Sequence, residues 1–178
     1  MAEKSAPQPV GTVEPEYQLW EPIDVDMAGV FAGLSAEDLA YRDRARAFVQ
    51  SEVRPVIADL WDRAAYPLDL ARRLGELDLL RDGVDVPGFP EQSLLAASLT
   101  TMELARGDGS IATIVGVQGG LALRSIALCG SEAQRERWLA PLSRGDELGA
   151  FALTEPTHGS DSVSLETRAE ADGDGYVI

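Results

Sequence analysis

The organisation of this chain changes at Phe151–Asp161, which reads FALTEPTHGSD. The segment starts as an apolar, strand-like run and breaks at Glu155-Pro156, because proline restricts the residue before it and supplies no backbone donor. The chain then passes through Gly159, where we expect a positive φ, to the hydroxyl of Ser160. A turn of this kind offers a hydroxyl, free backbone amides and a glycine that permits close approach. These groups suit a polar, partly anionic cofactor.

The composition limits what else the chain can be. It has 178 residues, enough for one domain or one and a part, and 45% of them are apolar, so a sizeable core is possible. Acidic residues number 30 against 15 basic ones, a net charge of −15. Such a surface binds phosphate backbones poorly, so we predict no nucleic-acid partner.

The single cysteine and the apolar runs indicate in which cellular compartment the chain is expected to fold. Because Cys129 is the single cysteine, the chain cannot form an internal disulfide, which favours an intracellular setting. Cys129 itself is interpreted as a small core residue. Residues 1–11 are polar and contain no signal-peptide pattern. The longest apolar run, residues 111–123, is short for a membrane span and contains Gln118. We therefore predict a buried bundle helix there, no membrane partner and a cytoplasmic location.

Helical patterns dominate the first four fifths of the chain. Residues 1–33 are interrupted by four prolines and are predicted to form an irregular arm. Capping serines, apolar spacing and glycine stops then predict six helices, with a loop over residues 82–90 between the third and the fourth. The expected helices cover approximately residues 35–51, 55–65, 67–77, 91–106, 110–129 and 131–145.

The period changes after Gly145. Residues 164–171 alternate between two kinds of side chain, which predicts a strand, and Asp172–Gly175 reads as a hairpin turn. The chain is thus predicted to be mainly α, with a helical bundle over residues 34–146 and the first strands of a sheet over residues 147–178. A sheet this small leaves edges unpaired, so we expect the sequence to be a fragment or its sheet to be completed by another chain.

Three segments in order resemble the acyl-CoA dehydrogenase family. Residues 153–161 are similar to its flavin-contacting Leu/Val-Thr-Glu-Pro-x-x-Gly-Ser-Asp element, residues 121–142 to a helix junction with Gly-Ser/Thr-Glu-x-Gln, and residues 102–110 to a Glu-Leu-x-Arg-x-Asp helix end. The resemblance covers roughly residues 35–178 and, through Tyr66-Pro67 and residues 116–118, is nearest to the glutaryl-CoA dehydrogenase and short-chain acyl-CoA oxidase branch.

The resemblance implies a fold and a cofactor. Residues 34–146 would form the family's N-terminal helical domain, and residues 147–178 would begin its β-barrel-like middle domain. FAD would be the cofactor. The residues expected to contact it are Phe151, Leu153, Thr154, Gly159 and Ser160. A threonine hydroxyl fixed at the pyrimidine edge of the flavin would stabilise the reduced ring.

The resemblance also implies a substrate, an acyl-CoA thioester. Ser160 would lie near the thioester, and Ala112, Thr113 and Val117 near the acyl chain. Ala112 stands where glutaryl-CoA enzymes carry an arginine, so we predict a short or medium unbranched chain rather than a glutaryl group. Thr113, Ile114, Val117 and Leu121 fall on one face of this predicted helix. The residues by themselves favour a place in the bundle core for that face, and the lining of a pocket is the second interpretation.

The implied reaction is α,β-dehydrogenation to a 2-enoyl-CoA, part of fatty acid metabolism. A glutamate base would take the α proton while the β hydride passes to the flavin. We expect that base beyond Ile178, so no catalytic residue is assigned in this chain, and the fragment alone is expected to be inactive. Glu155 is interpreted as structural and His158 as an exposed turn residue, and no metal site is expected. The family further implies a flavoprotein electron acceptor and a homotetramer.

Two alternatives stay open. An acyl-CoA oxidase would share all these residues and would let oxygen reach the reduced flavin. A non-catalytic helical subunit, completed by a partner chain that supplies the base, would also fit the small sheet.

Overall fold

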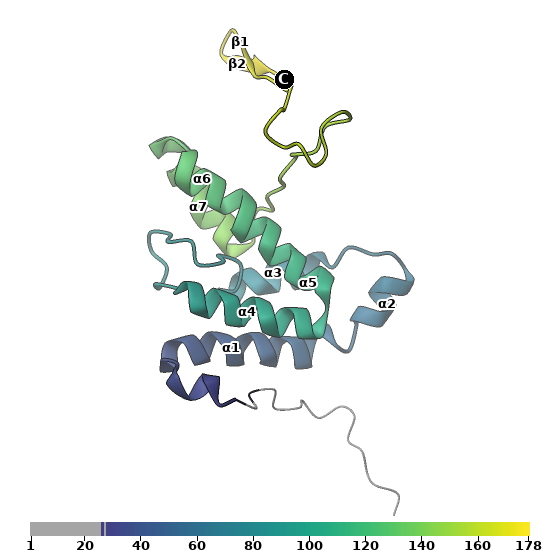
Figure 1. The fold of residues 1–178 in the computed structure, drawn as a ribbon, viewed down its shortest axis with the longest axis vertical. Helices are drawn as coiled ribbons and strands as arrows, with labels where there is room; N and C mark the ends of the chain where they lie inside the picture. Colours follow the sequence, from purple (N-terminus) through teal and green to yellow (C-terminus); the bar gives the residue numbers. More distant parts are fainter. Residues whose placement is uncertain (1–25, 27) are drawn as a thin grey trace, which may run out of the picture. The chain divides into compact units, whose positions relative to one another are not determined.

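The computed structural model describes Asp26 and residues 28–178 (Figure 1). The chain divides into two units, one that ends at Gly33 and one that comprises Leu34–Ile178. Of the first unit, only the part around the short 3-10 helix η1, Val30–Gly33, is described. Asp26 caps this helix, because its carboxylate accepts hydrogen bonds from the backbone N–H of Val30 at 2.6 Å. Most of the predicted N-terminal arm therefore lies outside the described residues.

The second unit is mainly helical, which confirms the predicted fold class. Two of its helical rods contain a π-helical stretch: η2 continues α1, and η3 joins α5 to α6. The elements are α1 (Ala36–Phe48), η2 (Val49–Val53), α2 (Ile57–Asp62), α3 (Leu68–Glu76), α4 (Leu94–Gly107), α5 (Gly109–Val115), η3 (Gly116–Leu123), α6 (Arg124–Cys129), α7 (Glu132–Arg144), β1 (Glu170–Asp172) and β2 (Gly175–Val177).

Local signals set most helix boundaries. Ser35 and Ser131 cap α1 and α7 as predicted, and Ser131 forms the expected capping box with Gln134. Gly145 ends α7 with φ 72°, the left-handed conformation that glycine adopts without strain. α4 begins at Leu94, later than predicted, because Ser93 provides its N-cap.

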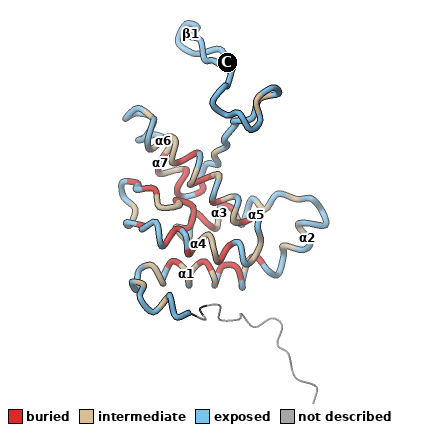
Figure 2. Tube along the Cα trace, in the orientation of Figure 1, coloured by how far each residue is buried: buried red, intermediate tan, exposed pale blue. Residues whose placement is uncertain are grey.

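Two apolar clusters form the core (Figure 2). The larger one is centred on the contact between α1 and α4, and α5 joins it through Ile111 and Val115. The smaller one joins Leu123 of η3 to Leu139 and Leu142 of α7. The rod formed by α5, η3 and α6 thus contributes to both clusters, which makes it the central element of the bundle.

That rod also has the length and composition of a membrane-spanning helix. The apolar segment Gly109–Cys129 is longer than the run 111–123 recognised in the sequence, and it is the one such segment among the described residues. One side of it packs against α3, α4 and α7. Its last residue, Cys129, is exposed, so the prediction that Cys129 belongs to the core is wrong. The rod extends to Cys129, whereas its last buried residue is Leu123.

The C-terminal residues contain less sheet than predicted. The hairpin itself is confirmed: β1 and β2 pair antiparallel, with Ala171 opposite Tyr176. The predicted strand over residues 164–171 is wrong except for its last two residues, and the apolar residues 148–153 do not form a strand. In the described part of the chain, β1 and β2 have only each other as partners, and a strand requires a neighbour to bond its backbone.

Candidate functional site

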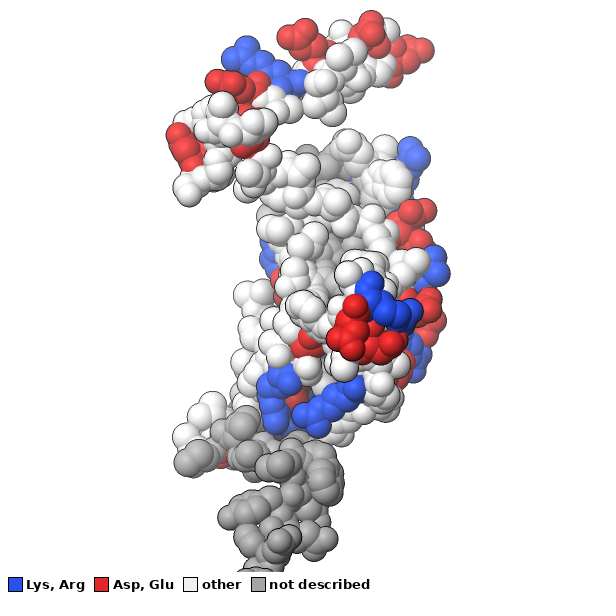
Figure 3. All heavy atoms as spheres, turned by 90° about the vertical axis from the view of Figure 1, so that its right-hand side faces the viewer, with Lys and Arg blue, Asp and Glu red and all other residues white. Residues whose placement is uncertain are grey.

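An apolar hollow opens beside the outer face of α5 and η3. Its volume is about 370 Å³, and its lining residues are Tyr66, Ser110, Thr113, Ile114, Val117, Gln118, Leu148 and Gly149. None of these side chains is charged. Figure 3, viewed from the right-hand side of Figure 1, shows acidic and basic side chains in mixed patches that leave a broad uncharged area between them.

This hollow changes the interpretation of the fifth predicted helix. The side that enters the core carries Ile111, Val115 and Ala122. Thr113 and Val117, predicted to contact substrate, both line the hollow, whereas Ala112 does not and packs against the larger core cluster. Ile114 lines the hollow and also packs against the larger core cluster, whereas Thr113 and Leu121 are exposed, so the preference for bundle core on this face is wrong for those two residues.

Sequence reasoning did not assign Tyr66, Leu148 and Gly149 to this site. Tyr66 comes from the turn before α3 and is 61% exposed, which is unusual for a large aromatic side chain. Leu148 and Gly149 come from the segment after α7. The aromatic residue before Pro67 was the only sequence signal, because the other two belong to an irregular segment with no periodicity.

A second hollow, of about 560 Å³, lies beside α2 and shares Tyr66 and Ser110 with the first. Its wall includes Trp61, whose indole N–H donates to Asp108 Oδ2 at 2.8 Å. Asp108 also caps α5 by accepting from the backbone N–H of Ser110 at 2.8 Å. Burial raises the pKa of Asp108, but the hydrogen bonds from Trp61, Ser110 and Ile111 outweigh burial and hold it below its ordinary value.

The turn at residues 155–158 is closed by its own backbone. The N–H of Glu155 donates to the carbonyl of His158, and the N–H of His158 donates to the carbonyl of Glu155, each at 3.2 Å. The Glu155 carboxylate accepts from the backbone N–H of Glu166 and of Thr167, both at 2.8 Å, and these bonds lower its pKa. His158 is partly buried rather than exposed, and its Nδ1 lies 3.0 Å from Thr157 Oγ1.

Of the predicted cofactor contacts, Phe151 lines one of the hollows described in this subsection. It closes a third one, of about 400 Å³, together with Ser125, Ile126 and Trp138. Leu153, Thr154, Gly159 and Ser160 are exposed, and the structure does not bring them to this hollow. The remaining lining residues are Ala122, Leu142, Glu147, Leu148, Gly149 and Ala150.

The exposed groups of this segment still fit a flavin chemically. Phe151 and Leu153 present apolar surface, and the Thr154 hydroxyl makes no hydrogen bond within the described residues, so it is available as a donor. At Gly159 an added Cβ would meet no atom within 4 Å. The expected positive φ at Gly159 is wrong, because none of the described left-handed positions is Gly159. Open space, rather than backbone strain, distinguishes that position.

No group of three His, Cys, Asp or Glu side chains within the described residues is arranged to hold a metal ion.

Known proteins resemble the chain over most of its length. The sequence model of the acyl-CoA dehydrogenase N-terminal domain matches residues 35–146. The mitochondrial short-chain specific acyl-CoA dehydrogenase of Rattus norvegicus is 35% identical over 140 residues, which cover 77% of this chain and 34% of that protein. The chain therefore spans about a third of the length of the curated relatives it matches.

Solved structures agree. A glutaryl-CoA dehydrogenase from Mycobacterium smegmatis superposes with a TM-score of 0.77 at 41% identity, covering 84% of this chain and 39% of that one. A second structure of a glutaryl-CoA dehydrogenase from the same organism, in complex with FADH2, gives a TM-score of 0.74 at 34% identity over 79% of this chain and 36% of that one. With the helical order, the capping pattern and the turn all in place, the chain belongs to the acyl-CoA dehydrogenase family.

Proposed function

We propose that this chain forms the acyl-chain side of an enzyme that carries out FAD-dependent α,β-dehydrogenation of an acyl-CoA thioester. The observation that carries the proposal is the uncharged hollow beside α5 and η3, whose wall at Leu148 and Gly149 leads directly into the segment beginning at Phe151. Residues 34–146 form the helical domain in this proposal, and residues 147–178 begin the middle β domain.

Thr113, Ile114 and Val117 receive the acyl chain in the hollow. A volume of about 370 Å³ lies at the low end for small-molecule sites, which favours a short or medium chain. A distal carboxylate, as in a glutaryl group, would meet no cation among the lining residues, and an unpaired buried carboxylate is costly. A short or medium unbranched acyl chain is therefore the proposed substrate class.

Phe151, Leu153, Thr154, Gly159 and Ser160 hold the cofactor. Phe151 and Leu153 cover its apolar rings, the Thr154 hydroxyl donates to its polar edge, and the open space at Gly159 and Ser160 admits its pyrophosphate. When bound, FAD supplies the hydride acceptor. The base that takes the α proton is assigned to no residue of this chain.

A flavoprotein electron acceptor, a homotetrameric assembly and a cytoplasmic location complete the proposal. The electron acceptor and the assembly follow from the family resemblance, and the location follows from the single cysteine and the apolar runs.

Visible absorption of the purified chain supplied with FAD, measured with the chain alone and together with the polypeptide that supplies the base, tests the function. A bound flavin that is bleached anaerobically by butyryl-CoA supports the dehydrogenase. Rapid re-oxidation of the bleached flavin with release of hydrogen peroxide supports the oxidase, which uses the same residues. A colourless chain that gains flavin only with a partner supports a non-catalytic subunit. A chain that binds no flavin in any of these conditions contradicts the proposal.

A further inference from the structure

The carboxamide of Gln118 uses both its nitrogen and its oxygen to bond the backbone of the segment that follows α7. Gln118 lies on η3 and is 2% exposed. Its Nε2 donates to the carbonyls of Leu142 at 2.8 Å and of Glu147 at 2.9 Å, and its Oε1 accepts from the backbone N–H of Gly149 at 2.7 Å. Two acceptors on one side and a donor on the other fix the orientation of the carboxamide.

Gly149 provides an independent sign that this segment is held tightly against η3. A Cβ built at Gly149 would lie 2.5 Å from the Cβ of Ala122 and 3.6 Å from Oε1 of Gln118. No side chain fits at such a distance. Residues 147–149, called the linker below, therefore lie against η3 more closely than any residue other than glycine would allow.

The linker separates two hollows. Leu148 and Gly149 line both the hollow of about 370 Å³ beside α5 and η3 and the hollow of about 400 Å³ that Phe151 closes. Gln118 lines the first of these, and Ala122, one turn further along the rod, lines the second. The position of the linker thus decides the shape of both hollows and the starting point of the segment from Phe151 onward.

We propose that Gln118 is a positioning residue that clamps the linker onto η3 and so places the turn after Phe151 relative to the acyl hollow. The role in catalysis rests on the proposed function, whereas the clamp itself does not. No other uncharged side chain of this length offers two amide protons and an acceptor. Leucine at position 118 would remove the partner of the part-buried Glu147 carbonyl and of the Gly149 N–H, while the Leu142 carbonyl would keep the hydrogen bond that it accepts from the N–H of Gly145 at 3.3 Å.

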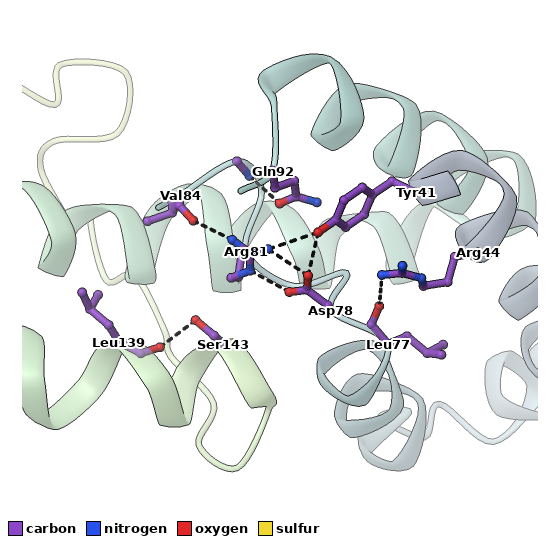
Figure 4. A network of polar contacts seen from close by, with 10 residues as sticks. Tyr41, Arg44, Leu77, Asp78, Arg81, Val84, Gln92, Leu139 and Ser143 are labelled. Carbon is purple, nitrogen blue, oxygen red and sulfur yellow. Dashed lines mark hydrogen bonds and ion pairs between the residues drawn. The ribbon is translucent and has the colours of Figure 1, made fainter. Parts of the chain in front are cut away.

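The first test is amide hydrogen exchange of the 178-residue chain. Gln118→Leu is compared with Gln92→Leu, which removes another buried glutamine whose Oε1 accepts from the N–H of Gly83 at 2.9 Å, far from the linker in sequence (Figure 4). We expect the Gly149 amide to exchange about tenfold faster in Gln118→Leu and at an unchanged rate in Gln92→Leu. Unchanged exchange in Gln118→Leu, or an equal rise in both variants, would overturn the clamp.

The second test uses the close contact between Gly149 and Ala122. Gly149→Ala should displace the linker and speed its exchange, and the double variant Ala122→Gly with Gly149→Ala should restore protection, because it removes the atom that the new methyl group meets. If the double variant does not restore protection, the contact with Ala122 is not the cause of the faster exchange in Gly149→Ala.

The third test measures FAD affinity by quenching of flavin fluorescence. Positioning predicts about tenfold weaker binding in Gln118→Leu and Gly149→Ala, wild-type binding in Gln92→Leu, and recovery in the double variant. Wild-type affinity in Gln118→Leu would overturn the positioning role. If the wild-type chain itself binds no FAD, the proposed function fails, and the exchange data still decide whether Gln118 clamps the linker.

Discussion

Arg81 and Asp78 form a buried ion pair beside α1 (Figure 4). Arg81 is fully buried, and its Nε and Nη2 donate to the two carboxylate oxygens of Asp78 at 2.6 and 2.8 Å. The Tyr41 hydroxyl donates to the same carboxylate at 2.7 Å, and Nη1 of Arg81 donates to the carbonyl of Val84 at 3.2 Å. The pair therefore ties α1 to the segment between α3 and α4.

Removing the charge of Asp78 should destabilise the fold strongly. Asp78→Asn keeps the size of the side chain and suits the positive φ of 55° at this position, but leaves the buried guanidinium without its counter-charge. We expect a loss of about 3 kcal/mol in the free energy of unfolding, measured by urea denaturation. Asp59→Asn, in the exposed pair with Arg63, is the control and should cost less than about 1 kcal/mol. Similar losses in the two variants would contradict the account.

Replacing two helical glycines by alanine should change the stability of the fold in opposite directions. A Cβ at Gly75 would lie 2.0 Å from the carbonyl oxygen of Arg144, so Gly75→Ala forces α3 and α7 apart and should destabilise by about 1–3 kcal/mol. A Cβ at Gly116 meets nothing within 4 Å, so Gly116→Ala should stabilise by roughly 0.5–1 kcal/mol. Thermal unfolding of both variants checks the pair, and a shift of the same sign in each would be inconsistent with the packing.

The loop held by Glu155 should open in acid. Backbone hydrogen bonds from Glu166 and Thr167 lower the pKa of Glu155 below its ordinary value of 4.5. A lowered folded-state pKa means that the stabilisation is complete above 4.5 and is lost as the pH falls through the folded-state pKa. Amide exchange at residues 166 and 167, corrected for intrinsic rates, should show lost protection in that range. Glu155→Gln should abolish the pH dependence; its persistence would point to another group.

Filling the acyl hollow should slow the reaction of long acyl chains more than that of short ones. Val117→Phe adds volume to the wall of the hollow. In the chain combined with the polypeptide that supplies the base, it should reduce the rate of flavin bleaching by octanoyl-CoA at least about tenfold more than that by butyryl-CoA. Leu128→Phe is the control, because Leu128 is 74% exposed and lines none of the three hollows described above. An equal loss for both thioesters would place the acyl chain elsewhere.

Much of the fold was predictable because it follows from local chemistry. Ser35 and Ser131 stabilise the first turns of α1 and α7 through side chains three residues from the amides they accept. Gly145 and the hairpin after Asp172 likewise need only the conformational freedom of a few neighbouring residues. The predicted strand over residues 164–171 was mostly wrong, because alternation describes a strand that has a partner and cannot supply one.

The sequence by itself determined the helices, their caps and the family, since each depends on residues close together in the chain. Only the tertiary structure decided that Ile111 and Val115 enter the core while Thr113 and Val117 line a hollow, and that Gln118 reaches across to Gly149. Helical spacing defines the faces of the rod from Gly109 to Cys129, but which face becomes buried depends on where α1, α3, α4 and α7 lie around it.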